Sequence, residues 1–174
     1  IDWEIYVVDN NSTDGSQAEV KKRFPEVKLI ENETNTGFAH ANNQALSIMH
    51  GRFAVLLNSD AVLKENSVKR LLAFMATTPS AGIAGVQLLN DDGSRQNSID
   101  NFPSTETEIF NKSILRFFFS GKYPSKNRSY QGPIEVDSVI GACMMVRKEA
   151  MDDVGVFDED YFIFLEETDW CFRM

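Results

Sequence analysis

Carboxylate and amide side chains end one apolar run of this sequence and interrupt another. Asp9 ends the run "EIYVVD", whereas Asn58, Ser59 and Asp60 interrupt the run "FAVLLNSDAVL". Ligands of an open parallel sheet bind outside the carboxyl ends of its strands, so these side chains would share one edge. A carboxylate there can hold a divalent cation. The structural alternatives are an Asx turn or helix cap at Asp9 and a simple turn at Asp60.

A third acidic group lies near the end of the chain, in "FDEDYFIFLEETDWCFRM". Its carboxylates alternate with large apolar and aromatic side chains. Burial of a carboxylate among such side chains disfavours its charged form and raises its pKa, which suits a general base. The alternative is a solvated acidic helix face. The carboxylates concerned are Asp158, Glu159, Asp160, Glu166, Glu167 and Asp169.

The runs around the first two groups predict alternating strands and helices. Apolar runs rich in β-branched residues stop at polar turn clusters, and the segments between them have helical spacing of apolar residues. Such an order specifies βαβ units, a parallel sheet and right-handed crossovers. The expected elements are a strand ending near Asp9, a helix over 15–24 with Ala18, Val20 and Phe24 on its apolar side, a strand over 26–32, a helix ending at Gly51 and a strand over 52–63.

The remaining segments predict a mixed sheet. A helix over 64–80 has apolar residues at helical spacing and is expected to pack on the sheet. The segment 81–98 predicts a strand, an Asp-Gly turn and a return, which adds antiparallel members. The segment 136–155 predicts a strand and a short helix that ends at Gly155.

Residues 99–135 differ from the rest because Ser, Asn, Pro and Lys surround one apolar stretch, "IFNKSILRFFFSGKYPSKNR". They predict a mobile insertion that contains a short amphipathic helix. This helix either covers one sheet face or forms an acceptor or membrane-edge contact. The second possibility draws on Lys122, Lys126 and Arg128, which follow the apolar stretch.

The composition predicts one compact domain in a reducing compartment. The 174 residues carry a net charge of −9, which disfavours nucleic acid and anionic lipid as partners and suits a bound divalent cation. Cys143 and Cys171 make no metal-ligand pattern and are expected to be small buried side chains. His40 and His50 are expected on helices or the surface. No run approaches the roughly 18 apolar residues of a membrane span.

Four motifs in one order resemble glycosyltransferase family 2, especially its rhamnosyltransferase-like members. They are "VVDNNSTDGS", "NTGFAHANNQA", "VLLNSDAVL" and "GACMMVRKEAMDDVGVFDEDYFIFLEETDWCFR". The resemblance implies an α/β GT-A fold, a Rossmann-like three-layer sandwich with a mixed, mainly parallel central sheet. It also implies one truncated domain over 1–174 that lacks the first strand and the C-terminal end. Residues 1–90 would bind the nucleotide sugar, and 91–174 would bind the acceptor.

The resemblance also implies roles for individual residues. Asp60 matches the last Asp of an Asp-x-Asp motif that holds Mg²⁺ or Mn²⁺ on a diphosphate, although Asn58 replaces its first Asp. Glu167 matches the catalytic base, with Glu166 and Asp169 as alternatives. The expected donor-binding residues are Asp9, which matches the acid after the second strand of the family, Asn11 close to it, Asn35, Gly37 and Asn43 around the following loop and helix, Asn58, and Gly141 and Ala142 beside the donor sugar.

The implied reaction moves a sugar from a nucleotide-diphosphate donor to an acceptor hydroxyl with inversion. A dTDP- or UDP-linked donor, a saccharide or lipid-linked saccharide acceptor and a role in bacterial surface polysaccharide synthesis are expected. The expected location is cytoplasmic, including the inner face of the membrane. One alternative is a catalytically inert nucleotide-sugar-binding module, favoured by Asn58. A nucleotidyltransferase is less favoured, because "NNSTDGS" contains no Lys or Arg for a phosphate loop.

Overall fold

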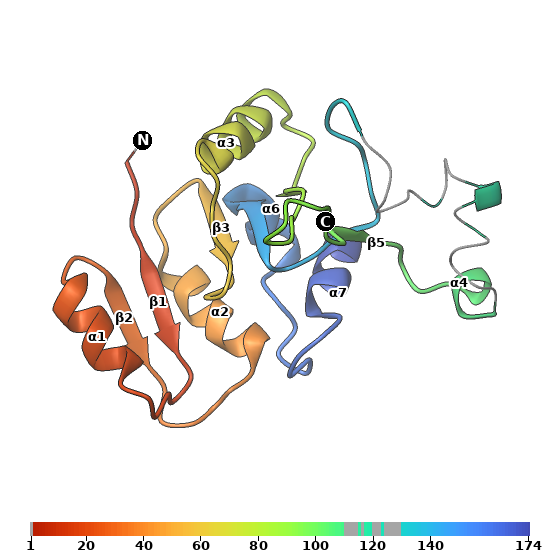
Figure 1. The fold of residues 1–174 in the computed structure, drawn as a ribbon. Coiled ribbons are helices and arrows are strands. Elements are labelled where there is room, and N and C mark those ends of the chain that lie inside the picture. Colours follow the sequence, from red (N-terminus) through yellow and green to blue (C-terminus); the bar gives the residue numbers. More distant parts are fainter. Residues whose placement is uncertain (1, 110–114, 116, 120–122, 124–129) are drawn as a thin grey trace.

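The computed structural model describes residues 2–109, 115, 117–119, 123 and 130–174. Strands and helices alternate along most of the described chain, as the sequence predicts (Figure 1). In chain order the elements are β1 (Tyr6–Asp9), α1 (Ser16–Arg23), β2 (Lys28–Glu31), α2 (Phe38–Ile48), β3 (Phe53–Leu57), α3 (Ser67–Thr77), β4 (Ile83–Gly85), β5 (Ile99–Asp100), α4 (Thr105–Ile109), β6 (Ser138–Val139), β7 (Cys143–Arg147), α6 (Lys148–Val154) and α7 (Glu166–Arg173).

The first βαβ unit is confirmed. β1 and β2 pair in parallel, with Tyr6 opposite Lys28 and Asp9 opposite Glu31. α1 connects them but has no buried residue; Ala18 and Phe24 are exposed, so its expected apolar face is largely uncovered. Of its apolar side chains, only Val20 is half-buried.

The second sheet differs from the parallel sheet expected through β3. β7 lies between β3 and β4 and pairs antiparallel with both, and β5 and β6 form a further antiparallel pair. Among the described residues, β1 and β3 do not pair with each other. The mixed α/β character is confirmed, but antiparallel pairs outnumber the one parallel pair. β7 is the central strand of this sheet, and its residues Cys143 to Val146 are all buried.

β3 is shorter than the predicted strand over 52–63. It ends at Leu57, and the chain then turns, with Ala61 N donating to Asn58 O at 3.0 Å. Val62 is 93% exposed, so the apolar residues after Asp60 are not part of a buried strand. The polar interruption thus ends the strand.

The main core lies between the second sheet and helices α2, α6 and α7. Its buried members include Ala39, Leu56, Met144, Phe157 and Trp170. A smaller cluster lies under α3, where Leu71 and Met75 pack near Ala84 and Met145, as the predicted helical spacing requires. α2 also contacts β1, so this helix joins the two sheets. The β1–β2 pair and the sheet that contains β3 lie on either side of α2 (Figure 1).

Other predictions of local structure are confirmed. Leu89 and Arg95 form an antiparallel bridge around the Asp-Gly turn, and α6 ends at Gly155 with a φ of 86°. Both cysteines are free; Cys143 is buried and Cys171 is half-buried. Burial raises the pKa of each thiol.

The predicted insertion over 99–135 lies only partly within the described residues. β5 and α4 belong to it, and the side chains of Phe117, Phe118 and Phe119 are exposed. The basic residues Lys122, Lys126 and Arg128 lie outside the described part. Among the residues that the structure does describe, no helix has the length and apolar character needed to cross a membrane.

Candidate active site

The N-terminus of α2 is the centre of the candidate site. Asn10 Nδ2 donates to Gly37 O at 3.1 Å, and Phe38 N donates to Phe162 O at 3.0 Å. Gly37 has a φ of 85°, and a Cβ built on it would lie 2.6 Å from Phe162 O. Only glycine suits this position, because both its backbone conformation and the close approach of Phe162 exclude a side chain. Asn35 Oδ1 accepts from Gly37 N at 3.0 Å and holds the turn.

The turn after β1 accounts for Asp9 structurally. Asp9 is buried, and its Oδ1 accepts hydrogen bonds from Ser12 N at 2.9 Å and from Gln17 Nε2 at 2.6 Å. The hydrogen bonding of Ser12, ahead of that of Gln17, holds the pKa of Asp9 below its usual value. Asn11 is exposed with a φ of 67° and forms the turn. The local turn contact expected as the structural alternative is thus present through Oδ1 of Asp9, and the donor-binding role of Asp9 stays a prediction.

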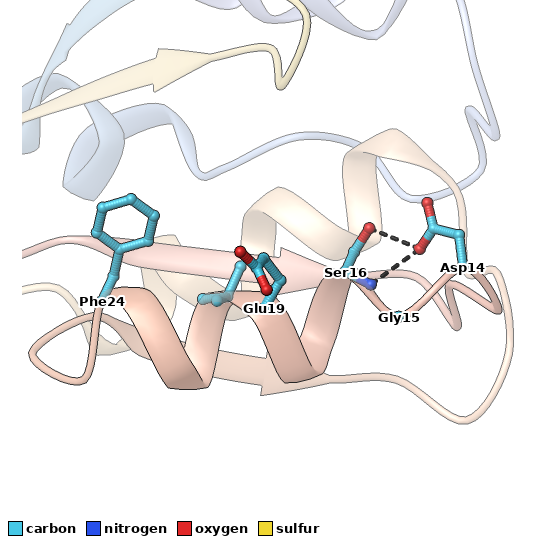
Figure 2. A pocket seen from close by; sticks show the side chains of 6 residues that line it. Asp14, Gly15, Ser16, Glu19 and Phe24 are labelled. Atoms are coloured by element: carbon cyan, nitrogen blue, oxygen red, sulfur yellow. Dashed lines mark hydrogen bonds between the residues drawn. The ribbon is translucent and has the colours of Figure 1, made fainter.

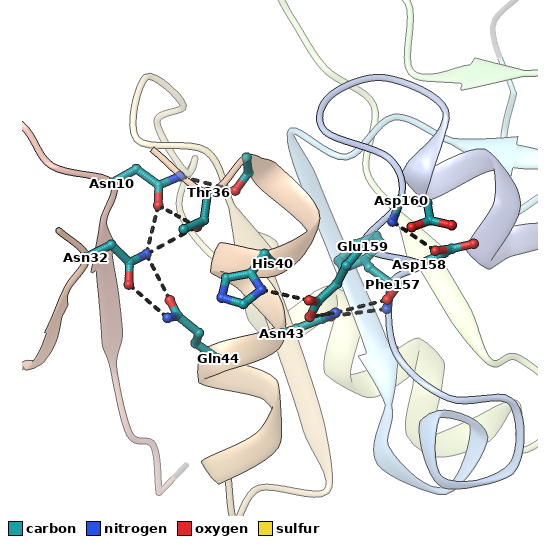
Figure 3. A network of polar contacts seen from close by, with 11 residues as sticks. Asn10, Asn32, Thr36, His40, Asn43, Gln44, Phe157, Asp158, Glu159 and Asp160 are labelled. Carbon is teal, nitrogen blue, oxygen red and sulfur yellow. Dashed lines mark hydrogen bonds and ion pairs between the residues drawn. The ribbon is translucent and has the colours of Figure 1, made fainter. Parts of the chain in front are cut away.

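An amide network beside this turn was not predicted from the sequence. Asn32 Nδ2 donates to Asn10 Oδ1 at 2.8 Å and to Gln44 Oε1 at 3.0 Å, and Thr36 Oγ1 donates to Asn10 Oδ1 at 3.1 Å (Figure 3). It ties the ends of β1 and β2 to α2. The only signal in the sequence was an amide after each strand, which is also an ordinary turn composition.

The β3 edge, defined here as Asn58–Asp60, lies next to the start of β7. Asn58 N donates to Ala142 O at 3.0 Å, whereas Asp60 is exposed in the turn. Within the described residues, no three His, Cys, Asp or Glu side chains are grouped to hold a metal ion. Asp60 suits a cation that takes its other ligands from a diphosphate, since Mg²⁺ is usually held by one or two carboxylates together with substrate phosphates.

Glu167 of α7 and Phe38 of α2 both lie near Gly141. A Cβ built on Gly141 would be 3.7 Å from Phe38 Cζ and 3.9 Å from Glu167 Cβ, which is ordinary van der Waals contact. Burial raises the pKa of Glu167, and the nearby charges of Glu166 and Asp100 raise it further. A half-buried carboxylate of this kind is a usable general base.

The two alternative bases are in different environments. Asp169 Oδ2 accepts from Arg173 Nε at 2.8 Å in an ion pair, which occupies one oxygen of the carboxylate. Glu166 is 5% exposed, and its Oε2 has no hydrogen-bond partner among the described residues. Asp169 is thus committed to Arg173, and Glu166 is shielded from solvent. The geometry favours Glu167.

The expectation of raised pKa values does not extend to the whole acidic segment. Hydrogen bonds from Asn43 and then His40 hold the pKa of Glu159 below its usual value. His40 Nδ1 contacts Glu159 Oε2 at 2.7 Å (Figure 3). Asn43, expected to line a nucleotide pocket, is buried and donates from Nδ2 to both Phe157 O and Glu159 Oε1.

An open depression on α1 is separate from these groups (Figure 2). Asp14 Oδ1 accepts from Ser16 N and Oγ there, which closes a local turn. Its wall is made by one surface of a short helix, so it holds none of the candidate catalytic residues. The lining residues are Asp14, Gly15, Ser16, Glu19, Val20 and Phe24.

Comparison with protein families gives one match over most of the chain. The model of the family described as "Glycosyl transferase family 2" matches residues 1–155. The N-acetylglucosaminyl-diphospho-decaprenol L-rhamnosyltransferase of Mycobacterium tuberculosis is 28% identical, covering 95% of this chain and 58% of that protein. The dTDP-rhamnosyl transferase RfbF of Shigella flexneri is 28% identical, covering 97% and 53%. The chain therefore spans little more than half of these relatives.

Solved structures of the same kind of fold are also similar. The mannosyltransferase PcManGT of Pyrobaculum calidifontis, in complex with GDP-Man and Mn²⁺, has a TM-score of 0.61 and 19% identity, covering 96% of this chain and 41% of that one. TarS of S. aureus in complex with UDP has a TM-score of 0.59 and 20% identity, covering 97% and 44%. At these identities the likeness shows the fold alone, which is the GT-A fold.

Proposed function

The chain belongs to glycosyl transferase family 2, and we propose that the protein containing it transfers a sugar from a nucleotide-diphosphate donor to an acceptor hydroxyl with inversion. The observation that carries this proposal is the placement of Glu167. Its carboxyl group has a raised pKa, and its Cβ lies near Gly141, which Phe38 at the start of α2 also approaches. The β3 edge is linked to the same loop by the hydrogen bond of Asn58 to Ala142.

The donor would lie over the β3 edge and the N-terminus of α2. Asp60 would hold Mg²⁺ or Mn²⁺, which supplies Lewis-acid stabilisation of the charge that develops on the leaving diphosphate. Asn11 and Asn35 are exposed in polar turns, and Gly37 is the buried residue that precedes α2. These three residues would line the nucleotide. The structure of PcManGT with GDP-Man and Mn²⁺ supports this kind of donor and ion.

Glu167 would act on the acceptor side. Its carboxylate takes the proton from the acceptor hydroxyl as that oxygen attacks the anomeric carbon, while the bond from that carbon to the diphosphate breaks. Attack from the face opposite the leaving group inverts the configuration. Because a general base must be deprotonated, the raised pKa matches Glu167 to work nearer neutral pH than an ordinary glutamate.

The division of labour follows the order of the chain. Residues 1–90 would hold the donor and 91–174 the acceptor, although β3 and β7 belong to the same sheet. The sugar and the acceptor are proposed from the relatives. Two of them are named as rhamnosyltransferases, and one name specifies a diphospho-decaprenol saccharide. A rhamnosyl donor and a lipid-linked acceptor for surface polysaccharide are therefore the first to test.

The test is a donor screen on the full-length protein. Thermal shifts are measured with dTDP-rhamnose, UDP-hexoses and GDP-mannose, each with and without Mn²⁺, because a ligand at 100 times its Kd stabilises the native state by about 2.7 kcal/mol. The best donor is then assayed for transfer to a lipid-linked saccharide. A stabilising donor that yields product supports the proposal, and the configuration of the product tests inversion.

A second candidate function is an inert nucleotide-sugar-binding module. Asn58 favours it, since the β3 edge offers a cation the Asp60 carboxylate without an acidic neighbour at position 58. In that case, the donor would shift the melting temperature, but neither transfer nor donor hydrolysis would occur. The same screen therefore separates the two functions.

A further inference from the structure

A buried amide of α2 holds the segment that leads to the base. Asn43 is 7% exposed and lies 114 residues from Phe157 in the sequence. Its Nδ2 donates to Phe157 O at 2.9 Å, and its Oδ1 accepts from Phe157 N at 3.1 Å (Figure 3). The side chain thus pairs with both backbone groups of one residue, as a neighbouring strand would.

The segment held in this way is also fixed to α7. The Phe157 ring lies 4.2 Å from the Trp170 ring between centroids, and Trp170 Nε1 donates to Gly155 O at 2.8 Å. Arg173 donates to Val154 O and Val156 O at 2.7 and 2.8 Å. Residues 154–157 therefore lie between α2 and α7 and are bonded to both.

The contacts of residues 154–157 connect to Glu167, the proposed base, through one turn of α7. Trp170 is fully buried and lies three residues after Glu167 on α7, a spacing that places both on one side of the helix. A shift of Phe157 must move Trp170, because the closely packed core leaves few voids to absorb it. The position of Phe157 therefore determines where the start of α7 lies.

We propose that Asn43 is a positioning residue, which sets the place of Glu167 by clamping Phe157 between α2 and α7. The inference rests on the proposed function, since it takes Glu167 as the base. α2 also begins at Gly37, which meets the polar turn at Asn10. α2 therefore contacts both the polar turn at Asn10 on the donor side and the segment at Phe157 on the side of the base, and it fixes their relative position.

Hydrogen-bond counting and burial weigh against the competing assignment, in which Asn43 contacts the nucleotide. An asparagine amide has two N–H donors. Both are used here, one on Phe157 O and one on Glu159 Oε1, each at 2.9 Å. A nucleotide acceptor atom could be bound only by giving up one of these contacts.

The experiment compares Asn43→Ala with the wild type in the full-length protein. Because misplacing a catalytic group by about 1 Å can cost 10²-fold in rate, kcat is expected to fall about 100-fold. The Kd of the nucleotide-sugar donor is expected to stay within about twofold, because the donor-side residues are unchanged. An increase in donor Kd at unchanged kcat would overturn the proposal in favour of nucleotide contact.

Asn42→Ala is the matched control. Asn42 is the adjacent residue on the same helix, and its Nδ2 donates only locally, to Phe38 O at 2.9 Å. It makes no hydrogen bond to residues 154–160 that the structure describes. Its kcat is expected within about threefold of the wild type, and a fall equal to that of Asn43→Ala would contradict a specific clamp.

Glu159→Ala covers the case in which Asn43→Ala does not fold. The Glu159 side chain is 48% exposed, so its removal leaves the core intact while it deletes one clamp contact and the pairing with His40. A fall of about fivefold in kcat at unchanged donor Kd is expected. An unchanged kcat would then count against the proposal.

A titration separates failure of this inference from failure of the proposed function. With carbon-13-labelled glutamate and Glu167→Gln as the assignment reference, the pKa of Glu167 can be followed by NMR without any substrate. Loosening the clamp is expected to move this pKa down toward that of an ordinary glutamate, since less desolvation remains. An unchanged titration in a folded Asn43→Ala variant would overturn the clamp even if no transfer activity is found.

Discussion

The β3 edge and the start of α7 each contribute one carboxylate to the candidate site, Asp60 and Glu167, and the two are positioned differently. Asp60 is exposed in a turn after a strand that ends at Leu57. Glu167 is half-buried on a helix fixed by Trp170 and Arg173 to residues 154–156. The first carboxylate is placed by a local turn, and the second is placed by the core.

This difference matches what each carboxylate is proposed to do. A cation on a diphosphate takes part of its coordination from the donor, so an exposed carboxylate that meets the incoming ligand is sufficient. A base must be desolvated and aimed at one hydroxyl, and this requires rigid support before any substrate binds. We therefore expect changes near α7 to affect rate and changes at the β3 edge to affect donor binding.

The largest effect is expected for Glu167→Gln. Loss of the general base should lower kcat by about 10²- to 10⁴-fold with little change in donor Kd, measured by steady-state transfer and by donor titration. Asp169→Asn provides the contrast, because that carboxylate is paired with Arg173. Retained transfer in Glu167→Gln together with its loss in Asp169→Asn would move the base to Asp169.

Gly37→Ala should strongly destabilise the junction that supports α7. Its backbone, with a φ of 85° and a ψ of 176°, lies in a region that essentially only glycine adopts, and a Cβ would meet Phe162 O at 2.6 Å, so a loss of about 3 kcal/mol in unfolding free energy is expected from strain and overlap together. Gly15→Ala is a control at another positive-φ glycine, in the αL conformation with a φ of 91° and nothing within 4 Å of its Cβ, and about 1 kcal/mol is expected. Equal losses in chemical denaturation would show that the contact with Phe162 is unimportant.

Substitutions at the β3 edge should change how donor binding depends on Mn²⁺. Asp60→Ala is expected to remove the enhancement of donor binding by Mn²⁺, whereas Asn58→Asp adds a carboxylate and should tighten Mn²⁺ about tenfold, since charge count tunes such sites. Both are measured by donor titration over a range of Mn²⁺ concentrations. If donor affinity in Asp60→Ala still depends on Mn²⁺, the ion is held elsewhere.

The smallest effect is expected in the dependence on pH. The pKa of Glu167 is raised in the folded protein. On the acid side of the pH profile, kcat should therefore begin to fall at a pH above the pKa of an ordinary glutamate. Between the ordinary and the raised pKa, the folded state binds more protons than the unfolded state. Stability contributed by this group is therefore present below that window and falls as pH rises through it. Melting temperatures of Glu167→Gln should lack this component, and identical pH profiles would contradict the burial effect.

Local structure was predictable where a pattern is short in range. The end of β1 follows from an apolar run that stops at polar residues, and the helix of α3 follows from the spacing of Leu71 and Met75. Asp60 was expected near the carboxyl end of a strand, and it stands in the turn that follows Leu57. In contrast, the resumption of apolar residues after Asp60 suggested a longer strand, and the exposure of Val62 shows that hydrophobicity alone does not ensure burial.

Two features required contacts across the whole chain. β7 lies between β3 and β4 although it follows them by more than 50 residues, and no local pattern specifies that neighbour. The partner of Asn43 is equally remote, and the amide looks the same in the sequence whether it binds a nucleotide or a backbone. Long-range pairing is decided by which surfaces bury one another, a property of the assembled core.

The sequence by itself determined which residues can do chemistry and at which ends of local elements they stand, because turns, caps and apolar spacing act over a few residues. The tertiary structure alone decided what each of them is free to do. Oδ1 of Asp9 is held in its own turn, Asp169 pairs with Arg173 and Asn43 bonds to Phe157, whereas Glu167 is half-buried near Gly141. The reason is physical: hydrogen-bond capacity and desolvation depend on the neighbours that folding supplies.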